Sequence, residues 1–254
     1  MSHLNLRDDV ADPIGEATLR IMSRAPRYHR WIAQLIEPYL GDRVLEVGAG
    51  VANMTRWLVG DRHVVATDPD PAYLRVLRSR LEGQPNVEVR PLRLPDVDES
   101  WKAERLDTAV LLNILEHVDE DVESLVALAA VLTPGARVVI FVPAMPALYG
   151  TLDRALSHFR RYSVPELRQK LETAGLEVQL MRYCNMPGIF GWWFHSRITK
   201  REILPALQVR LYDFLVPVVS RLERAITPPW GQSLLAVART AETKAPVESR
   251  PPGS

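Results

Sequence analysis

Glu46, Gly48, Gly50 and Asp68 are the first residues whose types and spacing indicate ligand binding. Glu46 and the two glycines end a short apolar run, and Asp68 ends the next one. The glycines permit a sharp turn and a close approach of the backbone to a ligand. Amides at the start of the following helix would face that ligand, and an acid at the tip of the second strand suits a ribose diol. Glu46 would repel a pyrophosphate but attract a cationic group.

The Glu46-x-Gly48-x-Gly50 pattern resembles the first motif of class I S-adenosylmethionine-dependent methyltransferases. Asn53 stands where that family has a third glycine, or Ala52 if the spacing is tighter. The resemblance implies S-adenosylmethionine as cofactor and S-adenosylhomocysteine as product, with contacts from Glu46, Gly48, Ala49, Gly50, Asp68 and Pro69. The same loop could instead serve an NAD(P)-dependent oxidoreductase, but Glu46 and the missing third glycine argue against a dinucleotide.

The segment Asn113 to His117 follows a fourth apolar run and resembles the motif after the fourth strand of the same family. That motif lines the methionine end of the cofactor and the substrate entrance. The resemblance therefore implies Asn113 and Leu115 as cofactor contacts and His117 as a candidate catalytic base. An exposed loop pair is the alternative for Glu116 and His117.

A loop from Tyr149 to Ser163 is rich in side chains that do chemistry, and it resembles a bacterial subgroup of these enzymes. The functional interpretation places His158 near the transferred methyl group, oriented by Asp153. An arginine would hold an anionic part of the substrate. The predicted substrate contacts are Tyr149, Arg160, Arg161 and Tyr162. The alternative is a solvated charged loop, or ion pairs that tie the loop to the sheet.

Alternating strand and helix patterns predict an α/β fold that positions these residues. We expect a doubly wound, mostly parallel, seven-stranded Rossmann-like sheet, with the last strand antiparallel as in the family. Its ligand should bind at the carboxyl ends of the strands. The predicted divisions are an N-terminal helical segment (1–40, two helices separated at Pro26), the core (41–184), a helical insertion or lid (185–231), the last strand (232–240) and a disordered tail (241–254).

The insertion combines four aromatic residues between 190 and 194 with an amphipathic helix through 204–222. Core packing or dimerisation is the favoured role, so a monomer or homodimer is expected. An apolar lid or a membrane-contacting surface is the alternative. The aromatic residues favour an apolar acceptor, and the arginines favour an anionic group on it.

Bulk composition narrows the class of protein. The 254 residues include 31 basic and 31 acidic side chains and are 47% hydrophobic, which suits a globular domain and gives no general basic field for nucleic acid. A single cysteine, Cys184, excludes an internal disulfide framework. We expect a cytoplasmic enzyme with a small-molecule substrate and no transmembrane segment, and no metal-ligand spacing is apparent. A non-catalytic cofactor-binding regulatory subunit is a third hypothesis.

Overall fold

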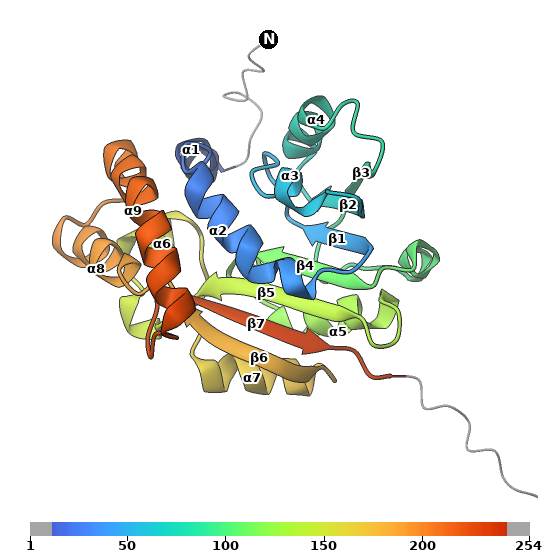
Figure 1. Cartoon of the computed structure of the whole chain (residues 1–254). Helices are drawn as coiled ribbons and strands as arrows, with labels where there is room; N and C mark the ends of the chain where they lie inside the picture. Colours follow the sequence, from blue (N-terminus) through green and yellow to red (C-terminus); the bar gives the residue numbers. More distant parts are fainter. Residues whose placement is uncertain (1–11, 243–254) are drawn as a thin grey trace, which may run out of the picture.

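Seven strands form one sheet, in the order β3-β2-β1-β4-β5-β7-β6, in the computed structural model of the chain (Figure 1). The structure describes residues 12–242, so residues 1–11 of the predicted N-terminal segment and nearly all of the predicted disordered tail lie outside the described residues. Strands β1 to β5 pair in parallel, whereas β7 runs antiparallel to both β5 and β6, which confirms the predicted sheet. The strands are β1 Arg43–Val47, β2 His63–Asp68, β3 Val87–Pro91, β4 Thr108–Leu112, β5 Arg137–Pro143, β6 Glu177–Cys184 and β7 Ser233–Arg239.

The helices connect these strands and begin where the sequence supplies start signals. Pro26 is the first residue of α2, as its rigid φ angle favours. Asp70 caps α4 by accepting a hydrogen bond from the Ala72 amide. The α-helices are α1 Pro13–Met22, α2 Pro26–Ile36, α3 Thr55–Leu58, α4 Pro71–Arg80, α5 Asp121–Val131, α6 Thr151–Ala155, α7 Val164–Thr173, α8 Gly188–Trp193 and α9 Ala206–Ala225. The short 3-10 helices are η2 Glu37–Tyr39, η3 Glu99–Glu104, η4 Leu115–His117 and η5 Pro146–Leu148, and a π-helix, η6, spans Phe194–Ile198.

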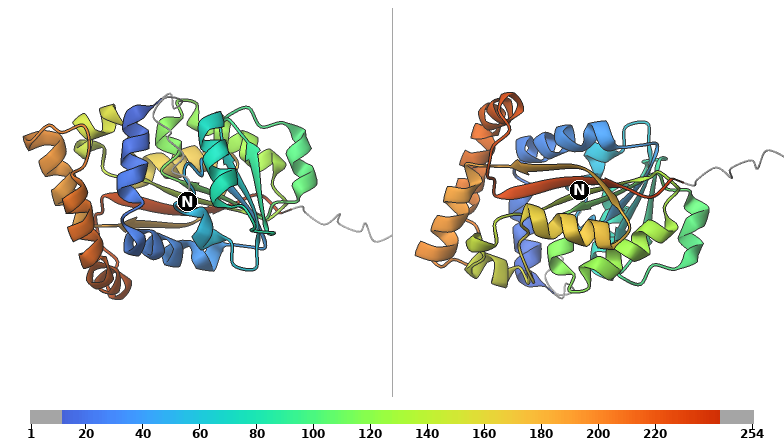
Figure 2. Two further views of the ribbon diagram at one scale, coloured as in Figure 1. Left: turned by 90° about the horizontal axis from the view of Figure 1, so that it is seen from above. Right: turned by 90° about the horizontal axis from the view of Figure 1, so that it is seen from below.

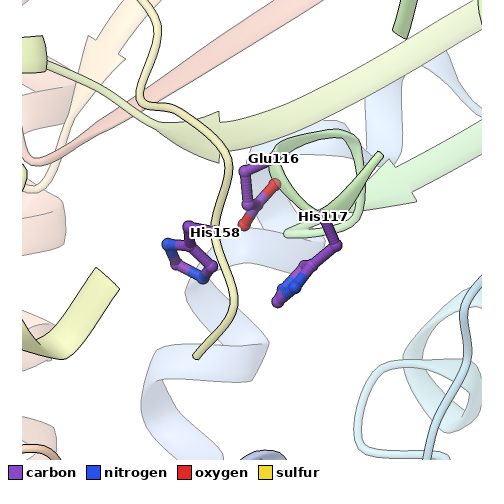
Figure 3. Close-up of side chains that lie close together, drawn as sticks. All are labelled: Glu116, His117 and His158. Atoms are coloured by element: carbon purple, nitrogen blue, oxygen red, sulfur yellow. The ribbon is translucent and has the colours of Figure 1, made fainter. Parts of the chain in front are cut away.

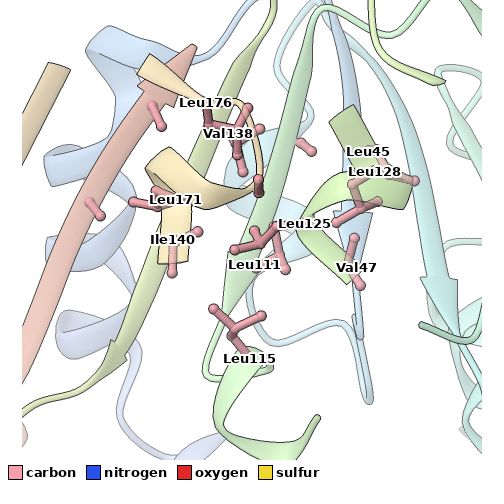
Figure 4. Close-up of a cluster of buried hydrophobic side chains, with 14 of the residues drawn as sticks. Leu45, Val47, Leu111, Leu115, Leu125, Leu128, Val138, Ile140, Leu171 and Leu176 are labelled. Atoms are coloured by element: carbon pink, nitrogen blue, oxygen red, sulfur yellow. The ribbon is translucent and has the colours of Figure 1, made fainter. Parts of the chain in front are cut away.

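Both faces of the sheet are covered, because neighbouring residues of each strand point to opposite faces. Leu111, Val138 and Ile140 pack with side chains of α5 and α7 on one face (Figure 4). On the other face, alternate residues of the same strands pack against α2 and α3, and α4 covers the outer strands. The near-continuous apolar sequence of β5 is explained by this burial on both faces.

The insertion between β6 and β7 lies across one end of the sheet. Helices α8 and α9 lie beyond the tips of β4 and β5, where the parallel strands end (Figures 1 and 2). Helix α9 is joined to α2 through the Tyr28 amide, which donates to the Asp213 carboxylate at 2.9 Å. Among residues 12–242, no helix is both long enough and apolar enough to cross a bilayer.

Candidate functional site

A cavity of about 1250 Å3 lies at the carboxyl ends of the strands. Its walls come from the loop after β1, from α1 and α2, from the loop after β4, and from the insertion. This position is the one expected for ligands of a doubly wound sheet. Predicted site residues that line it are Glu46, Gly48, Ala49, Gly50, Asp68, Pro69, Asn113, His117 and His158.

The turn after β1 requires glycine. Gly48 and Gly50 have φ angles of +70° and +56°, in the left-handed region that side chains disfavour. A Cβ on Gly48 would lie 2.1 Å from the Cδ1 atom of Ile114, in the loop after the neighbouring strand β4. Backbone, rather than side chains, therefore lines this part of the cavity.

Glu46 and Asp68 attract cations to the end of the cavity beside the turn after β1. Glu46 is only 3% exposed, and its Oε2 atom has no hydrogen-bond partner. Burial raises the pKa of Glu46 to about 7, and the nearby Asp68 charge contributes to this rise. Burial likewise raises the pKa of Asp68 to about 6, although its oxygens accept from the Gly50 and Asp70 amides at 3.0 and 2.9 Å. A cationic ligand would relieve the cost of ionising both carboxyls.

His158 is held by Asp153 at a second part of the same cavity. The Nδ1 atom of His158 lies 3.1 Å from Asp153 Oδ1, and both side chains are buried. Because a carboxylate only accepts hydrogen bonds, Nδ1 must donate, which leaves Nε2 as an acceptor. Asp153 also accepts from Arg161 Nε at 2.7 Å and from Trp192 Nε1 at 3.1 Å. The predicted pairing of Asp153 with His158 is present, and Asp153 itself does not line the cavity.

Burial alone would raise the pKa of Asp153. The hydrogen bond from His158 and the charge of Arg161 outweigh burial and hold the pKa of that carboxyl below its ordinary value. Asp153 therefore stays ionised and can support a positive charge on the His158 ring.

Glu116 and His117 complete the group around His158 (Figure 3). Glu116 is fully buried and neither of its carboxylate oxygens has a partner, which differs from the exposed loop pair considered as an alternative. Burial raises the pKa of Glu116 to about 8. The His117 ring meets the His158 ring edge-to-face, with centroids 4.7 Å apart. Burial of the ring among the loops, and to a smaller extent the His158 charge, lower the pKa of His117 to about 4, although the residue as a whole is exposed at the cavity.

The possible ligand atoms of Glu116, His117 and His158 lie within 4.8 Å of one another, close enough to share a metal ion. Sequence spacing could not indicate this group, because 41 positions separate His117 from His158 in two different loops. The Arg161 guanidinium already supplies a positive charge to Glu116 and lowers the pKa of that carboxyl against the effect of burial. This neighbouring cation would repel a divalent metal ion bound by the group.

The four predicted substrate contacts form bonds within the protein instead of facing the cavity. Tyr149, Arg160, Arg161 and Tyr162 do not line the cavity. Arg160 pairs with Asp119 and Asp121, Arg161 with Asp153, and the Tyr162 hydroxyl donates to Asp121. The Tyr149 hydroxyl donates to the His158 carbonyl at 2.7 Å. These bonds match the alternative considered for this loop, in which ion pairs tie it to the sheet.

Leu115, predicted as a cofactor contact, also lies away from the cavity. Its side chain is fully buried in the core beneath η4, beside Leu111 (Figure 4). Leu115 points into the core, where its side chain packs the loop after β4 against the sheet.

The sequence did not identify several polar residues of the cavity. Asn185 follows β6 directly and Gln232 precedes β7, and their side chains share a hydrogen bond of 2.7 Å. Tyr212 from α9 also donates to Asn185. The strand-end rule that selected Asp68 and Asn113 would have selected Asn185 as well. Tyr28 and His29 of α2, and Arg93, also line the cavity.

Comparison with known proteins identifies the family. Residues 45–138 match a family described as "Methyltransferase domain". A probable S-adenosylmethionine-dependent methyltransferase of Mycolicibacterium smegmatis is 30% identical over 213 residues, which cover 80% of this chain and 72% of that protein. The chain belongs to the S-adenosylmethionine-dependent methyltransferases.

Two further likenesses agree with this membership. A demethylmenaquinone methyltransferase of Clavibacter sepedonicus is 32% identical over 106 residues, which span 41% of this chain and 42% of that protein. The solved structure of an S-adenosylmethionine-dependent methyltransferase from Mesorhizobium loti has the same fold, with a TM-score of 0.55 over 81% of this chain and 96% of that one, at 12% identity. Nothing in these likenesses supports the oxidoreductase considered as an alternative.

The residues at the Glu46 end fit the methyltransferase cofactor, which carries an ammonium, a sulfonium and a ribose. Glu46 offers an unpartnered oxygen to a cation, and Asp68 lies at the strand tip where a ribose diol is held. The cradle at Gly48 has no room for a Cβ. Leu92, Arg93 and Leu94 line the cavity after β3.

Proposed function

We propose that this methyltransferase transfers the methyl group to a hydroxyl of an apolar small molecule. The observation that carries this proposal is the buried Asp153–His158 pair, which leaves a basic nitrogen at the cavity that also contains the Glu46–Asp68 end. A hydroxyl loses its proton when it accepts a methyl group, so a positioned base is useful there.

Each residue has a distinct role in this mechanism. S-adenosylmethionine, when bound, supplies a methyl group activated by its sulfonium. Glu46 would hold the cationic end of the cofactor and Asp68 its ribose. His158 Nε2 would accept the hydroxyl proton, while Asp153 fixes the tautomer and stabilises the charged ring. Because this pair is buried, the base keeps a fixed position. A fixed position favours attack of the acceptor oxygen in line with the sulfonium.

The remaining wall of the cavity favours an apolar acceptor. Ile32, Trp192, Leu204, Val209 and Leu215 supply much of it. Arg160 and Arg161, the basis for expecting an anionic group on the acceptor, are engaged elsewhere. The proposal therefore keeps the apolar acceptor and omits the anionic group. The relative named for demethylmenaquinone supports including quinols among the molecules tested.

The test is a methyl-transfer assay with isotopically labelled S-adenosylmethionine and a panel of acceptors. The panel pairs apolar phenols and quinols with polar acceptors of similar size, and with amine analogues of each hydroxyl compound. We expect labelled product from apolar hydroxyl acceptors. Turnover of only polar or only amine acceptors would contradict the proposal. Cofactor binding without any labelled product would favour the non-catalytic regulatory subunit.

Replacement of Glu46 by glutamine should weaken cofactor binding about 10- to 100-fold, because a charge-assisted hydrogen bond to an ammonium contributes about 1.5–3 kcal/mol. Calorimetric titration with S-adenosylhomocysteine measures this loss directly. Asp68→Ala should weaken binding as well. Glu88→Gln, an exposed carboxylate on β3, is the matched control and should leave binding unchanged.

The same titration should depend on pH. Glu46 has a pKa raised to about 7, so below that pH it is mostly protonated and offers no charge to the ligand. Affinity of the wild type should therefore rise between pH 5.5 and 7.5, and part of this rise should disappear in Glu46→Gln. An identical pH profile in wild type and variant would show that Glu46 does not face the ligand.

A further inference from the structure

Helix α9 turns its apolar side away from the protein. Leu207, Phe214 and Leu222 are 68%, 69% and 62% exposed. They share one stripe with Leu211, Leu215 and Val218, because residues three or four positions apart lie on one side of a helix. In a helix that packs on a core, such a stripe faces inward.

The inward side of α9 is mixed, with buried polar and apolar residues. The buried residues are Val209, Asp213, Val216, Ser220 and Glu223, and Val216 belongs to the core cluster that α2 shares. Asp213 accepts from the Tyr28 amide, and Glu223 accepts from the amides of Asn185 and Met186 at 3.0 and 2.8 Å. Polar contacts and Val216 therefore hold the helix to the domain, whereas the residues of its apolar stripe are exposed. The core-packing role considered from the sequence belongs to the inward side of α9 and not to this stripe.

The neighbouring elements extend the stripe into one surface, which we call the α8–α9 face. Helix α8 and its π-helical continuation lie beside α9 at the same end of the molecule (Figure 2). The exposed apolar residues of the α8–α9 face are Phe190, Trp193, Phe194, Ile198, Leu207, Leu211, Phe214, Leu215, Val218, Leu222, Ile226 and Trp230. So many large apolar side chains exposed together are typical of a surface that meets an apolar partner.

The charges around this face are positive. Exposed basic residues of the insertion are Arg197, Lys200, Arg201, Arg210, Arg221 and Arg224, and none of them has a salt bridge to a residue within 12–242. Acidic residues of the insertion are Glu202, Asp213 and Glu223, and the last two are buried. Arg27 of α2 adds a further cation, 5.4 Å from the centre of the Phe214 ring.

We propose that the α8–α9 face docks on the surface of an anionic lipid membrane. An apolar stripe flanked by arginines and lysine complements acyl chains bordered by anionic headgroups. A second copy of the chain suits the face less well. A twofold dimer places the same patch against itself, which would bring unpaired cations of both copies together.

The position of the cavity gives this docking a consequence for substrate entry. Phe194, Leu211 and Leu215 both line the cavity and are exposed on the α8–α9 face. An apolar acceptor could therefore pass from the membrane into the cavity without crossing water. This entry route rests on the proposed function, whereas docking itself does not depend on any reaction.

Co-sedimentation with vesicles tests the proposal. The assay contains neither cofactor nor acceptor, so its result does not depend on whether methyl transfer occurs. We use phosphatidylcholine vesicles with and without phosphatidylglycerol. The full chain should bind the anionic vesicles, and salt should weaken binding. Arg221→Gln should reduce binding about fivefold, and Phe214→Ser about tenfold or more. Arg78→Gln on α4 and Val126→Ser on α5 are exposed matched controls and should bind as the wild type does.

Circular dichroism and melting temperature check that each variant is folded, and sedimentation velocity gives the oligomeric state. Absence of binding to anionic vesicles would overturn the proposal. So would equal binding by all variants and controls. A dimer that Phe214→Ser dissociates, with no vesicle binding by the wild type, would assign the face to a second copy instead.

Discussion

Asp153→Asn should lower the free energy of unfolding by about 3–5 kcal/mol, the usual cost of leaving one charge of a buried ion pair without its partner. Arg161 is 2% exposed and relies on Asp153 Oδ1 and the Ala144 carbonyl. The side-chain amide of an asparagine at this position must also point its N–H group at another hydrogen-bond donor, in either of the two orientations of the amide. The donors are His158 and Arg161 on one side and the Gly150 and Trp192 N–H groups on the other. Thermal denaturation should show a fall of roughly 10 °C in melting temperature.

Asp119→Asn is the matched control, because Asp119 also pairs with an arginine but its side chain is 62% exposed. An exposed ion pair contributes about 0–1 kcal/mol, so this variant should melt close to the wild type. Replacing Arg161 by methionine in the Asp153→Asn background removes the unpaired cation and should recover part of the loss. Equal melting temperatures for Asp153→Asn and Asp119→Asn would contradict the assignment of a buried pair.

The positions that sequence reasoning predicted well are those fixed by local pattern. Gly48, Asp68 and Asn113 come directly after strands, and parallel strands bring their ends to one edge regardless of the details of packing. Helix starts such as Asp70 depend on a side chain and an amide two residues apart. Short-range rules of this kind can be read from a single sequence.

The positions that it did not predict depend on partners far along the chain. Arg160 finds Asp119 and Asp121 about forty positions earlier, and nothing in the local sequence shows whether an arginine meets a substrate or a carboxylate. The unpartnered Glu116 beside His158 likewise arises from two loops that meet only in the fold. Periodicity showed that α9 is amphipathic, but not which side faces the domain. That side contains Asp213 and Glu223, which bind backbone amides of distant segments, beside the buried Val216.

His158→Gln should reduce kcat about 10^2- to 10^4-fold, the usual contribution of a positioned general base. Glutamine can still bond to Asp153 but has no basic nitrogen to accept a hydroxyl proton. The dissociation constant of S-adenosylhomocysteine should stay within about twofold of the wild type, because the charges assigned to cofactor binding, Glu46 and Asp68, are unchanged. Methyl-transfer kinetics and calorimetry on the same preparation measure both quantities.

His63→Gln is the control for this substitution, since His63 opens β2 at the opposite end of the strands and does not line the cavity. It should leave kcat and cofactor affinity unchanged. A loss of cofactor affinity in His158→Gln as large as its loss of kcat would mean that His158 shapes the cavity rather than accepting a proton. A kcat within a few-fold of the wild type would mean that the acceptor arrives already deprotonated or carries a nucleophile that needs no base. The ratio of the two losses therefore distinguishes proton transfer from positioning at the Asp153–His158 pair.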